Sequence, residues 1–433
     1  MAETDEPMVQ VRFVTQLEER WRVTDAPIQL PTRLTRGGLS EVVNHLLETS
    51  TPRPFDFLLN SELLRGSVGK ALARHELSGE EVITLEYVEC VPPPRPEPSC
   101  PHQDWVAALA AHPSGGRLLL SACYDHAAYV WDGAGKQVAA LAGHTGPVKG
   151  VAWLSGGGGG GGILRAATAS KDQTVRTWSV APNAAGGAAS VACEAVLVGH
   201  KASVEGLAAN PSGDRLCSGG WDGAMLLWAV SEAPEAAETA PPTKRSKGAA
   251  GDGAGSAAAP AEASPITSLS GHGGCVSALC WPTSTLLYSG SWDGTVREWQ
   301  VEVGTPSATL AGQAAVLCLD VSLGSSLIAS GHTDHCLRIW DSRLQQAAMQ
   351  LQLPHKGWVS AARWCVQTPH LLASACYDGT VRLWDVRSTV PLHQLGTHAG
   401  KALSLTWDGP ERLASGGSDA EIRVSSIAMP AES

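Results

Sequence analysis

This sequence has few basic residues for its size, no closely paired cysteines and very little phenylalanine. Its 31 lysines and arginines stand against 42 aspartates and glutamates, which leaves a formal net charge of -11. Binding nucleic acid as the main ligand normally needs a basic surface, so this balance argues against it. The eleven cysteines include no CxxC pair. They stand singly, as small buried residues do in a reducing compartment.

Membrane and catalytic signatures are also missing from the sequence. No apolar run is long enough to span a bilayer, and the first residues do not form a secretory signal. We therefore expect a soluble, intracellular protein without a membrane partner. A phosphate-binding loop, a nucleophile elbow and a Cys/His metal spacing are absent as well. We do not expect an enzyme, nor a cofactor or metal bound by this chain alone.

Three phenylalanines against fifteen tryptophans is an unusual aromatic balance, and a repeat explains most of it. Between Ser121 and Asp419 one phrase occurs seven times: a run of small residues, an aspartate and, six residues later, usually a tryptophan. A period of roughly forty residues with this content predicts four-stranded sheets in a closed ring that holds partners. The aspartates are Asp125, Asp172, Asp222, Asp293, Asp334, Asp378 and Asp419, and the tryptophans are Trp131, Trp178, Trp228, Trp299, Trp340 and Trp384.

A Gly-His pair precedes three of the aspartates in phase with the repeat, and the combination resembles the WD-repeat family. A tight turn needs an acceptor for its free N–H groups, which an aspartate provides, and a buried imidazole needs a polar neighbour. We therefore interpret these residues as structural rather than catalytic or metal-binding. In that family the His, a Ser or Thr, the Asp and the Trp form a hydrogen-bonded set. The resemblance assigns to such sets His144, Asp172 and Trp178; His200, Asp222 and Trp228; and His272, Asp293 and Trp299.

The later repeats depart from this pattern. Gln313 stands where the fifth repeat would have its histidine, His355 and His398 lack the preceding glycine, and Ser425 replaces the seventh tryptophan. We expect these blades to be less tightly bonded. Only eight residues follow Ser425, so the last blade either takes a short strand from residues 99–104 or has three strands, and the sequence does not decide between them.

Two segments inside the ring have the composition of loops. Residues 231–265 are rich in Ala, Pro, Gly and Glu and cannot bury a core, so we expect a disordered insert. A glycine run over residues 156–162 is expected to be a flexible hairpin loop. Within the insert, Lys244, Arg245 and Lys247 form a weak candidate for a nuclear-import signal.

The first ninety residues have a different pattern, which predicts a ubiquitin-like β-grasp domain. We expect residues 1–8 to be disordered, residues 9–91 to form this domain, residues 92–103 to be a Pro-rich linker, and residues 104–428 to form the propeller. Ser40 is a plausible N-cap of the first helix. The expected strands are 9–15, 21–30, 55–59, 62–64 and 82–88, and the expected helices are 39–47 and 67–75.

Three stretches of this domain, RGGLSEVVNHLL, PFDFLLNSELLRGSV and LEYVECVPPP, resemble the Notchless-like N-terminal domain. That domain joined to a propeller is typical of a small family of ribosome-assembly factors. Notchless itself carries eight repeats, so the seven found in this sequence favour the branch that works in the pescadillo-containing complex. A Notchless-type factor and a WD-repeat adaptor of a ubiquitin ligase are the alternatives. The second lacks support, because neither an F-box-like helix nor a C-terminal Gly-Gly tail follows the domain.

The resemblance implies a non-enzymatic role in maturing the large ribosomal subunit and processing its rRNA. It implies that the propeller docks on a block-of-proliferation-type WD-repeat protein, which holds pescadillo, and that the trimer joins precursor particles of the large subunit. It also implies a location in the nucleus, in both nucleolus and nucleoplasm. The ubiquitin-like domain would then bind the metal-site domain of the midasin ATPase, which releases the factor.

The residue that the resemblance assigns to this release is Glu80. Its carboxylate would complete the shell of a Mg²⁺ ion held by midasin, since Mg²⁺ prefers oxygen ligands. Glu81 is the alternative if the register is shifted by one residue. An exposed loop glutamate is more often only a solvated charge.

A second candidate interface comes from the residue before each repeat aspartate, which the turn geometry directs to one face of the ring. Four of the seven are aromatic, and large aromatics at a solvent face often mark interaction sites. The alternative is that some of these rings pack on the next blade. The four predicted to bind a partner are Tyr124, Trp221, Trp292 and Tyr377.

Overall fold

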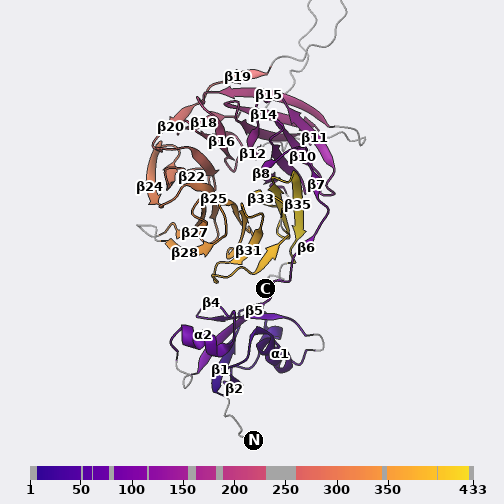
Figure 1. The fold of residues 1–433 in the computed structure, drawn as a ribbon, viewed down its shortest axis with the longest axis vertical. Coiled ribbons are helices and arrows are strands. Elements are labelled where there is room, and N and C mark those ends of the chain that lie inside the picture. The colour runs from indigo at the N-terminus through magenta and orange to yellow at the C-terminus, as the bar shows by residue number, and fades with distance from the viewer. Residues whose placement is uncertain are drawn as a thin grey trace, which may run out of the picture.

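The computed structural model describes residues 7–49, 52–60, 62–77, 82–114, 117–154, 162–181, 189–230, 260–343, 349–396 and 398–428. It contains a small mixed domain at the N-terminal end of the chain and a ring of sheets formed by the rest (Figure 1). Several predicted features lie outside the described residues. These are Glu80 and Glu81, residues 1–6, residues 156–161, and Lys244, Arg245 and Lys247.

The N-terminal domain has the predicted β-grasp topology. Its sheet has the order β2-β1-β5-β3-β4, and β1 runs parallel to β5. Alternate residues of β1 point into the core, so that Val9, Val11 and Phe13 are buried. The elements are β1 (Met8–Val14), a 3-10 turn (Glu19–Trp21), β2 (Ile28–Pro31), α1 (Arg36–Leu46), β3 (Phe55–Leu59), β4 (Glu62–Leu63), α2 (Val68–Arg74) and β5 (Ile83–Glu89).

Two local predictions in this domain are wrong. The first helix begins at Arg36, before the predicted start, because the two glycines that precede Leu39 are themselves helical. Ser40 is therefore inside the helix and does not cap it. Its hydroxyl donates to the Arg53 carbonyl at 3.1 Å and accepts from the Phe55 N–H at 3.0 Å, which joins α1 to β3. The predicted strand 21–30 is also shorter, because only β2 pairs with β1.

The ring consists of seven sheets, one for each copy of the repeat, as predicted. The first blade has β8 (Val106–Ala111), β9 (Leu119–Cys123), β10 (Ala127–Trp131) and β11 (Gln137–Ala142), and the second has β12 (Val148–Leu154), β13 (Leu164–Ser170), β14 (Thr174–Ala181) and β15 (Ser190–Val198). The third has β16 (Val204–Ala209), β17 (Arg215–Gly220), β18 (Met225–Ala229) and β20 (Thr267–Leu269), and the fourth has β21 (Val276–Cys280), β22 (Leu286–Ser291), β23 (Thr295–Gln300) and β24 (Thr305–Ala311). The fifth blade has β25 (Val316–Ser322), β26 (Leu327–His332), β27 (Cys336–Asp341) and β28 (Met349–Pro354), and the sixth has β29 (Val359–Trp364), β30 (Leu371–Cys376), β31 (Val381–Asp385) and β32 (His393–Leu395). The seventh has β33 (Ala402–Trp407), β34 (Arg412–Gly417) and β35 (Glu421–Ser426).

The N-terminal approach closes the ring, which settles the question that the sequence leaves open. Two short strands, β6 (Arg95–Pro96) and β7 (Cys100–Pro101), pair antiparallel with β35 at the outer edge of the seventh blade. The segment predicted as a linker is therefore partly a strand of the propeller. Proline is tolerated there because neighbouring residues supply the N–H donors. The Glu97 N–H donates to the Val424 carbonyl and the His102 N–H donates to the Ala420 carbonyl, each at 2.8 Å.

The predicted insert also contributes to a sheet. A three-residue strand, β19 (Ala261–Ala263), pairs parallel with β15 at the outer edge of the second blade. Residues 260–265 therefore lie in the fold, which corrects the predicted end of the insert. Residues 231–259 lie outside the described part of the chain.

The two parts of the chain meet at the sixth blade. The Leu63 N–H, in β4, donates to the carbonyl of Arg387 at 3.2 Å. The His393 ring nitrogen Nε2, in β32, lies 2.9 Å from the carbonyl of Val91, which follows β5. These contacts join the small domain to the rim of the ring beside the closing strands.

Candidate partner-binding face

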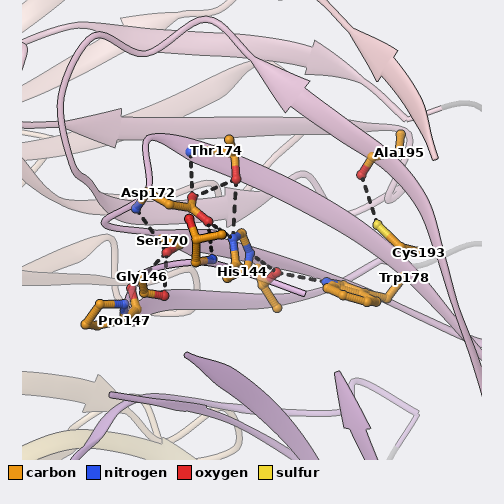
Figure 2. A network of polar contacts seen from close by, with 11 residues as sticks. His144, Gly146, Pro147, Ser170, Asp172, Thr174, Trp178, Cys193 and Ala195 are labelled. Carbon is orange, nitrogen blue, oxygen red and sulfur yellow. Dashed lines mark hydrogen bonds and ion pairs between the residues drawn. The ribbon is translucent and has the colours of Figure 1, made fainter. Parts of the chain in front are cut away.

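A hydrogen-bonded set holds the second blade together, and Figure 2 shows it. His144 lies 2.8 Å from the Asp172 carboxylate through Nδ1 and 2.8 Å from the Thr168 hydroxyl through Nε2. The Trp178 indole N–H donates to the same hydroxyl at 2.8 Å. The Asp172 carboxylate also accepts from the Thr145 N–H at 3.0 Å. The set therefore joins β13 and β14 to the loop that follows β11 and to the turn that contains Asp172.

The surroundings of Asp172 keep it charged. Burial would raise the pKa of this carboxyl, but the hydrogen bonds from His144 and Thr174 outweigh it and hold the pKa well below its usual range. The Asp172 carboxylate and the His144 ring both make their contacts within the blade. The residues fit a structural role rather than a reactive one.

The next two blades bring their predicted residues together in the same way. In each, the histidine bridges the aspartate and a serine hydroxyl, and the tryptophan donates to that hydroxyl. The sets are His200 with Asp222 (2.9 Å) and Ser218 (2.7 Å), to which Trp228 donates (2.8 Å), and His272 with Asp293 (2.9 Å) and Ser289 (2.7 Å), to which Trp299 donates (2.7 Å).

Other blades replace parts of the set with residues that the sequence pattern missed. In the fifth blade, His332 lies 2.8 Å from the Ser330 hydroxyl and takes the place left by Gln313. In the first blade, His102 lies 2.8 Å from the Ser121 hydroxyl. His102 follows Pro101 instead of a glycine, and His332 follows Gly331 but stands two residues before Asp334 instead of far before it. A search for any histidine near the repeat serine would have found both.

The sixth and seventh blades differ from each other. His355 lies 2.8 Å from the Ser374 hydroxyl but 3.0 Å from the Leu353 carbonyl rather than near Asp378. Arg382 donates to Asp378 instead, at 3.0 Å. In the seventh blade, His398 has both usual partners, Asp419 at 2.8 Å and Ser415 at 2.9 Å, although the tryptophan is missing. The predicted loss of hydrogen bonds is therefore found in the sixth blade, where the His–Asp contact is missing, and only for the tryptophan in the seventh.

The four predicted partner-binding aromatics gather at one mouth of the central channel. The innermost strands of the blades contact one another in cyclic order around this channel, and they enclose a cavity of about 270 Å³. Tyr124, Trp221, Trp292 and Tyr377 all line it, together with Trp105. We call these five residues the channel mouth. The turn residues of distant repeats therefore form one continuous site.

Aromatic pairing fixes the rings of the channel mouth. Trp221 and Trp292 come from neighbouring blades, and their ring centroids lie 5.1 Å apart. Tyr124 lies 5.3 Å from Trp105, and Tyr377 stacks on Trp358 at 5.4 Å. The alternative in which rings pack on the next blade is thus partly realised, yet Trp221 remains 51% exposed and Trp292 40%. Trp105 and Trp358 share a position that the repeat analysis overlooked, one residue before an innermost strand.

Lysines surround these rings. Lys149 donates to the Tyr124 hydroxyl at 2.9 Å and pairs with Glu205 at 3.2 Å. Burial would lower the pKa of Lys149, but Glu205 and Tyr124 raise it above its usual value. Lys401 lies 4.7 Å from the Tyr377 ring centroid. The channel mouth therefore combines aromatic surface with fixed positive charge, which suits binding to a protein.

The described residues offer little for catalysis or metal binding. In that part of the chain, no group of three or more His, Cys, Asp or Glu residues could hold a metal ion. Burial raises the pKa of the Cys123 thiol to about 12, so it is not an activated nucleophile. None of the described helices is long and apolar enough to cross a membrane.

Two family models match this chain. The NLE (NUC135) domain matches residues 9–72, which lie in the β-grasp domain. The WD domain, G-beta repeat, matches six segments. The segments are residues 97–132, 135–179, 191–229, 263–300, 304–341 and 349–385, which correspond to the first six blades.

Curated relatives match nearly the whole chain. A protein of Chlamydomonas reinhardtii named "Ribosome biogenesis protein WDR12 homolog" is 38% identical over 97% of this chain and 98% of its own length. Proteins with the same name are 37% identical in Arabidopsis thaliana, over 96% of both chains, and 32% identical in Nematostella vectensis, over 96% of this chain and 99% of the relative.

Proposed function

The chain belongs to the family of ribosome biogenesis proteins named WDR12 homologues, and we propose that it acts as a non-enzymatic scaffold in maturing the large ribosomal subunit. The observation that carries this proposal is the match along both parts of the chain, the NLE domain and the ring. The exposed aromatic residues of the channel mouth support it, because they are suited to binding a protein. A scaffold needs such a surface and no reactive group.

The first proposed contact is between the ring and a block-of-proliferation-type WD-repeat protein that holds pescadillo. The channel mouth supports it, because the exposed Trp221 and Trp292 are fixed by their mutual contact and lose little entropy on binding. Lys149 and Lys401 add positive charge that would favour acidic groups on the partner. Pescadillo would then join the ring through this partner.

The second proposed contact is between the β-grasp domain and the metal-site domain of the midasin ATPase. In the sequence, Glu80 falls between α2 and β5. Its carboxylate would complete the shell of a Mg²⁺ ion that midasin holds, because this ion prefers oxygen ligands. The chain itself would need no cofactor. A pull on this domain would be transmitted to the ring through β6 and β7, which belong to the seventh blade.

With these contacts the protein would act on precursor particles of the large subunit, in the nucleolus and then the nucleoplasm. Depletion of the protein tests this placement. We expect free large subunits to fall relative to small subunits in a sucrose gradient, and large-subunit rRNA precursors to accumulate. An unchanged ratio of subunits after complete depletion would contradict the proposal.

A further inference from the structure

A crevice of about 380 Å³ lies between the sixth and seventh blades, on the rim of the ring. Val381, Leu395 and Leu413 are the apolar residues of its lining that matter here, and Ser415 and Ser425 line it as well. The size falls within the roughly 300–1,000 Å³ of typical ligand pockets. Neither proposed contact of the preceding section uses this crevice.

In the other six blades an indole occupies the equivalent position. Ser425 pairs with Leu413 in the same register in which Trp228 pairs with Leu216 and Trp299 with Leu287. Each repeat tryptophan packs on the preceding blade, and its N–H donates to a hydroxyl on the neighbouring strand. The bonds are Trp131 to Ser121 (2.9 Å), Trp178 to Thr168 (2.8 Å), Trp228 to Ser218 (2.8 Å), Trp299 to Ser289 (2.7 Å), Trp340 to Ser330 (2.7 Å) and Trp384 to Ser374 (2.8 Å).

The seventh blade keeps the hydroxyl and the apolar residues that contact the indole in the other blades, but it has no indole of its own. Ser415 is the hydroxyl of this blade, and it still contacts His398 at 2.9 Å. The apolar residues that would pack against an indole, Val381 and Leu395, are also present. Gly396, which follows β32, also lines the crevice, and a methyl group added there would meet nothing within 4 Å.

We propose that the crevice binds a tryptophan side chain carried by an extended segment of a protein partner. The indole would take the place of the missing repeat tryptophan, and its N–H would donate to the Ser415 hydroxyl. The rim suits an extended segment, because β32 and β6 are the outermost strands of their blades and leave backbone groups for pairing. Glu97, Glu421 and Arg423 add polar groups at the rim.

Binding of N-acetyl-5-fluorotryptophanamide to the full chain, followed by fluorine NMR, tests this proposal. Ser425→Trp would fill the crevice from within, and Gly396→Leu would block it from the rim. We expect each substitution to weaken binding at least tenfold. Ser425→Ala leaves the crevice open and is the matched control, with binding within about twofold of the wild type. Ser425→Trp should also raise the unfolding midpoint, because it restores the buried indole.

The N–H donor and the aromatic ring are tested with two analogues. Methylation of the indole nitrogen should weaken binding about fivefold, the usual worth of one hydrogen bond. The fluorinated phenylalanine amide should bind more weakly still. The proposal is overturned if the wild type does not bind at ~1 mM ligand, the weak end of useful affinities, if Gly396→Leu binds normally, or if the phenylalanine amide binds equally well. These outcomes do not depend on the role in ribosome biogenesis.

Discussion

Trp221 and Trp292 contact each other across the boundary between the third and fourth blades, with ring centroids 5.1 Å apart and ring planes inclined by 50°. The Trp221 indole N–H also donates to the Glu205 carboxylate at 3.0 Å. The two rings are therefore held in place while much of their surface stays in solvent. Such a pair is suited to bind a protein partner at the channel mouth.

Replacing both tryptophans with alanine should weaken binding of the block-of-proliferation-type partner. Central interface aromatics often contribute about 2 kcal/mol or more each, but the effects of two rings in contact do not simply add, so we expect a rise in Kd of at least about thirtyfold, the effect of one such residue. Isothermal titration with the purified partner measures it. Leu323→Ala and Val366→Ala are controls. These exposed residues follow the innermost strands β25 and β29, so they lie at the ends of their blades that face away from the channel mouth. Equal binding by the double variant would exclude the channel mouth as the interface.

Replacing Glu80 with alanine should abolish binding of the β-grasp domain to the metal-site domain of midasin in the presence of Mg²⁺. The pescadillo-containing complex should form as before, because its proposed contact lies on the ring. A pull-down with each partner checks both results. Glu81→Ala is the matched control for charge and position. Normal midasin binding by Glu80→Ala, or loss only with Glu81→Ala, would show that Glu80 is not the ligand.

Replacing Asp172 with alanine should destabilise the ring more than the same change at Asp125. Asp172 bonds to His144 and to turn N–H groups, and removing this charged acceptor leaves several donors unsatisfied at roughly 1–3 kcal/mol each. Asp125 accepts from the Ala127 N–H and the Tyr129 hydroxyl and has no histidine partner among the contacts described, so we expect about 1–2 kcal/mol. Urea unfolding of the two variants measures the difference. Equal shifts of the midpoint would contradict this account of the set.

Stability should fall as the pH drops from about 6.5 to about 4. Burial lowers the pKa of His332 and of His355 to about 4 in the folded protein, against about 6.5 when unfolded. Within this window the unfolded chain binds more protons, so acid favours unfolding. Burial would raise the pKa values of Asp222 and Asp419, but the hydrogen bonds that these carboxylates accept lower them below the usual value.

Urea midpoints at pH 7.5, 5.5 and 4.5 check this pH dependence. His332→Asn should reduce the slope, because it removes one of the histidines whose pKa burial lowers while keeping a polar side chain beside Ser330. A midpoint that does not change between pH 7.5 and 4.5, or an unaltered slope in the variant, would contradict the assignment.

The sequence predicts the ring well because the Asp-to-Trp spacing fixes strand order inside each blade. It does not predict the closure, since β6 and β7 are two residues long and contain the prolines that usually exclude strands. The strand β19 is equally hidden in an alanine-rich tract. Such short strands form only because a neighbouring sheet offers an edge.

The candidate sites show the same division. The position of Tyr124, Trp221, Trp292 and Tyr377 at one face follows from turn geometry, but their convergence on one cavity depends on how the blades close. Ser425 is visible in the sequence as an exception to the repeat. The crevice beside it is not, because its walls come from Val381 and Leu395 of the preceding blade.

Affinity purification of the full chain, with mass spectrometry of what binds, tests the scaffold role most directly. The account predicts that the block-of-proliferation-type protein and pescadillo dominate, in amounts similar to the chain itself, with large-subunit precursor rRNA and proteins present. A purification dominated by cullins or proteasome subunits, without these partners, would contradict it.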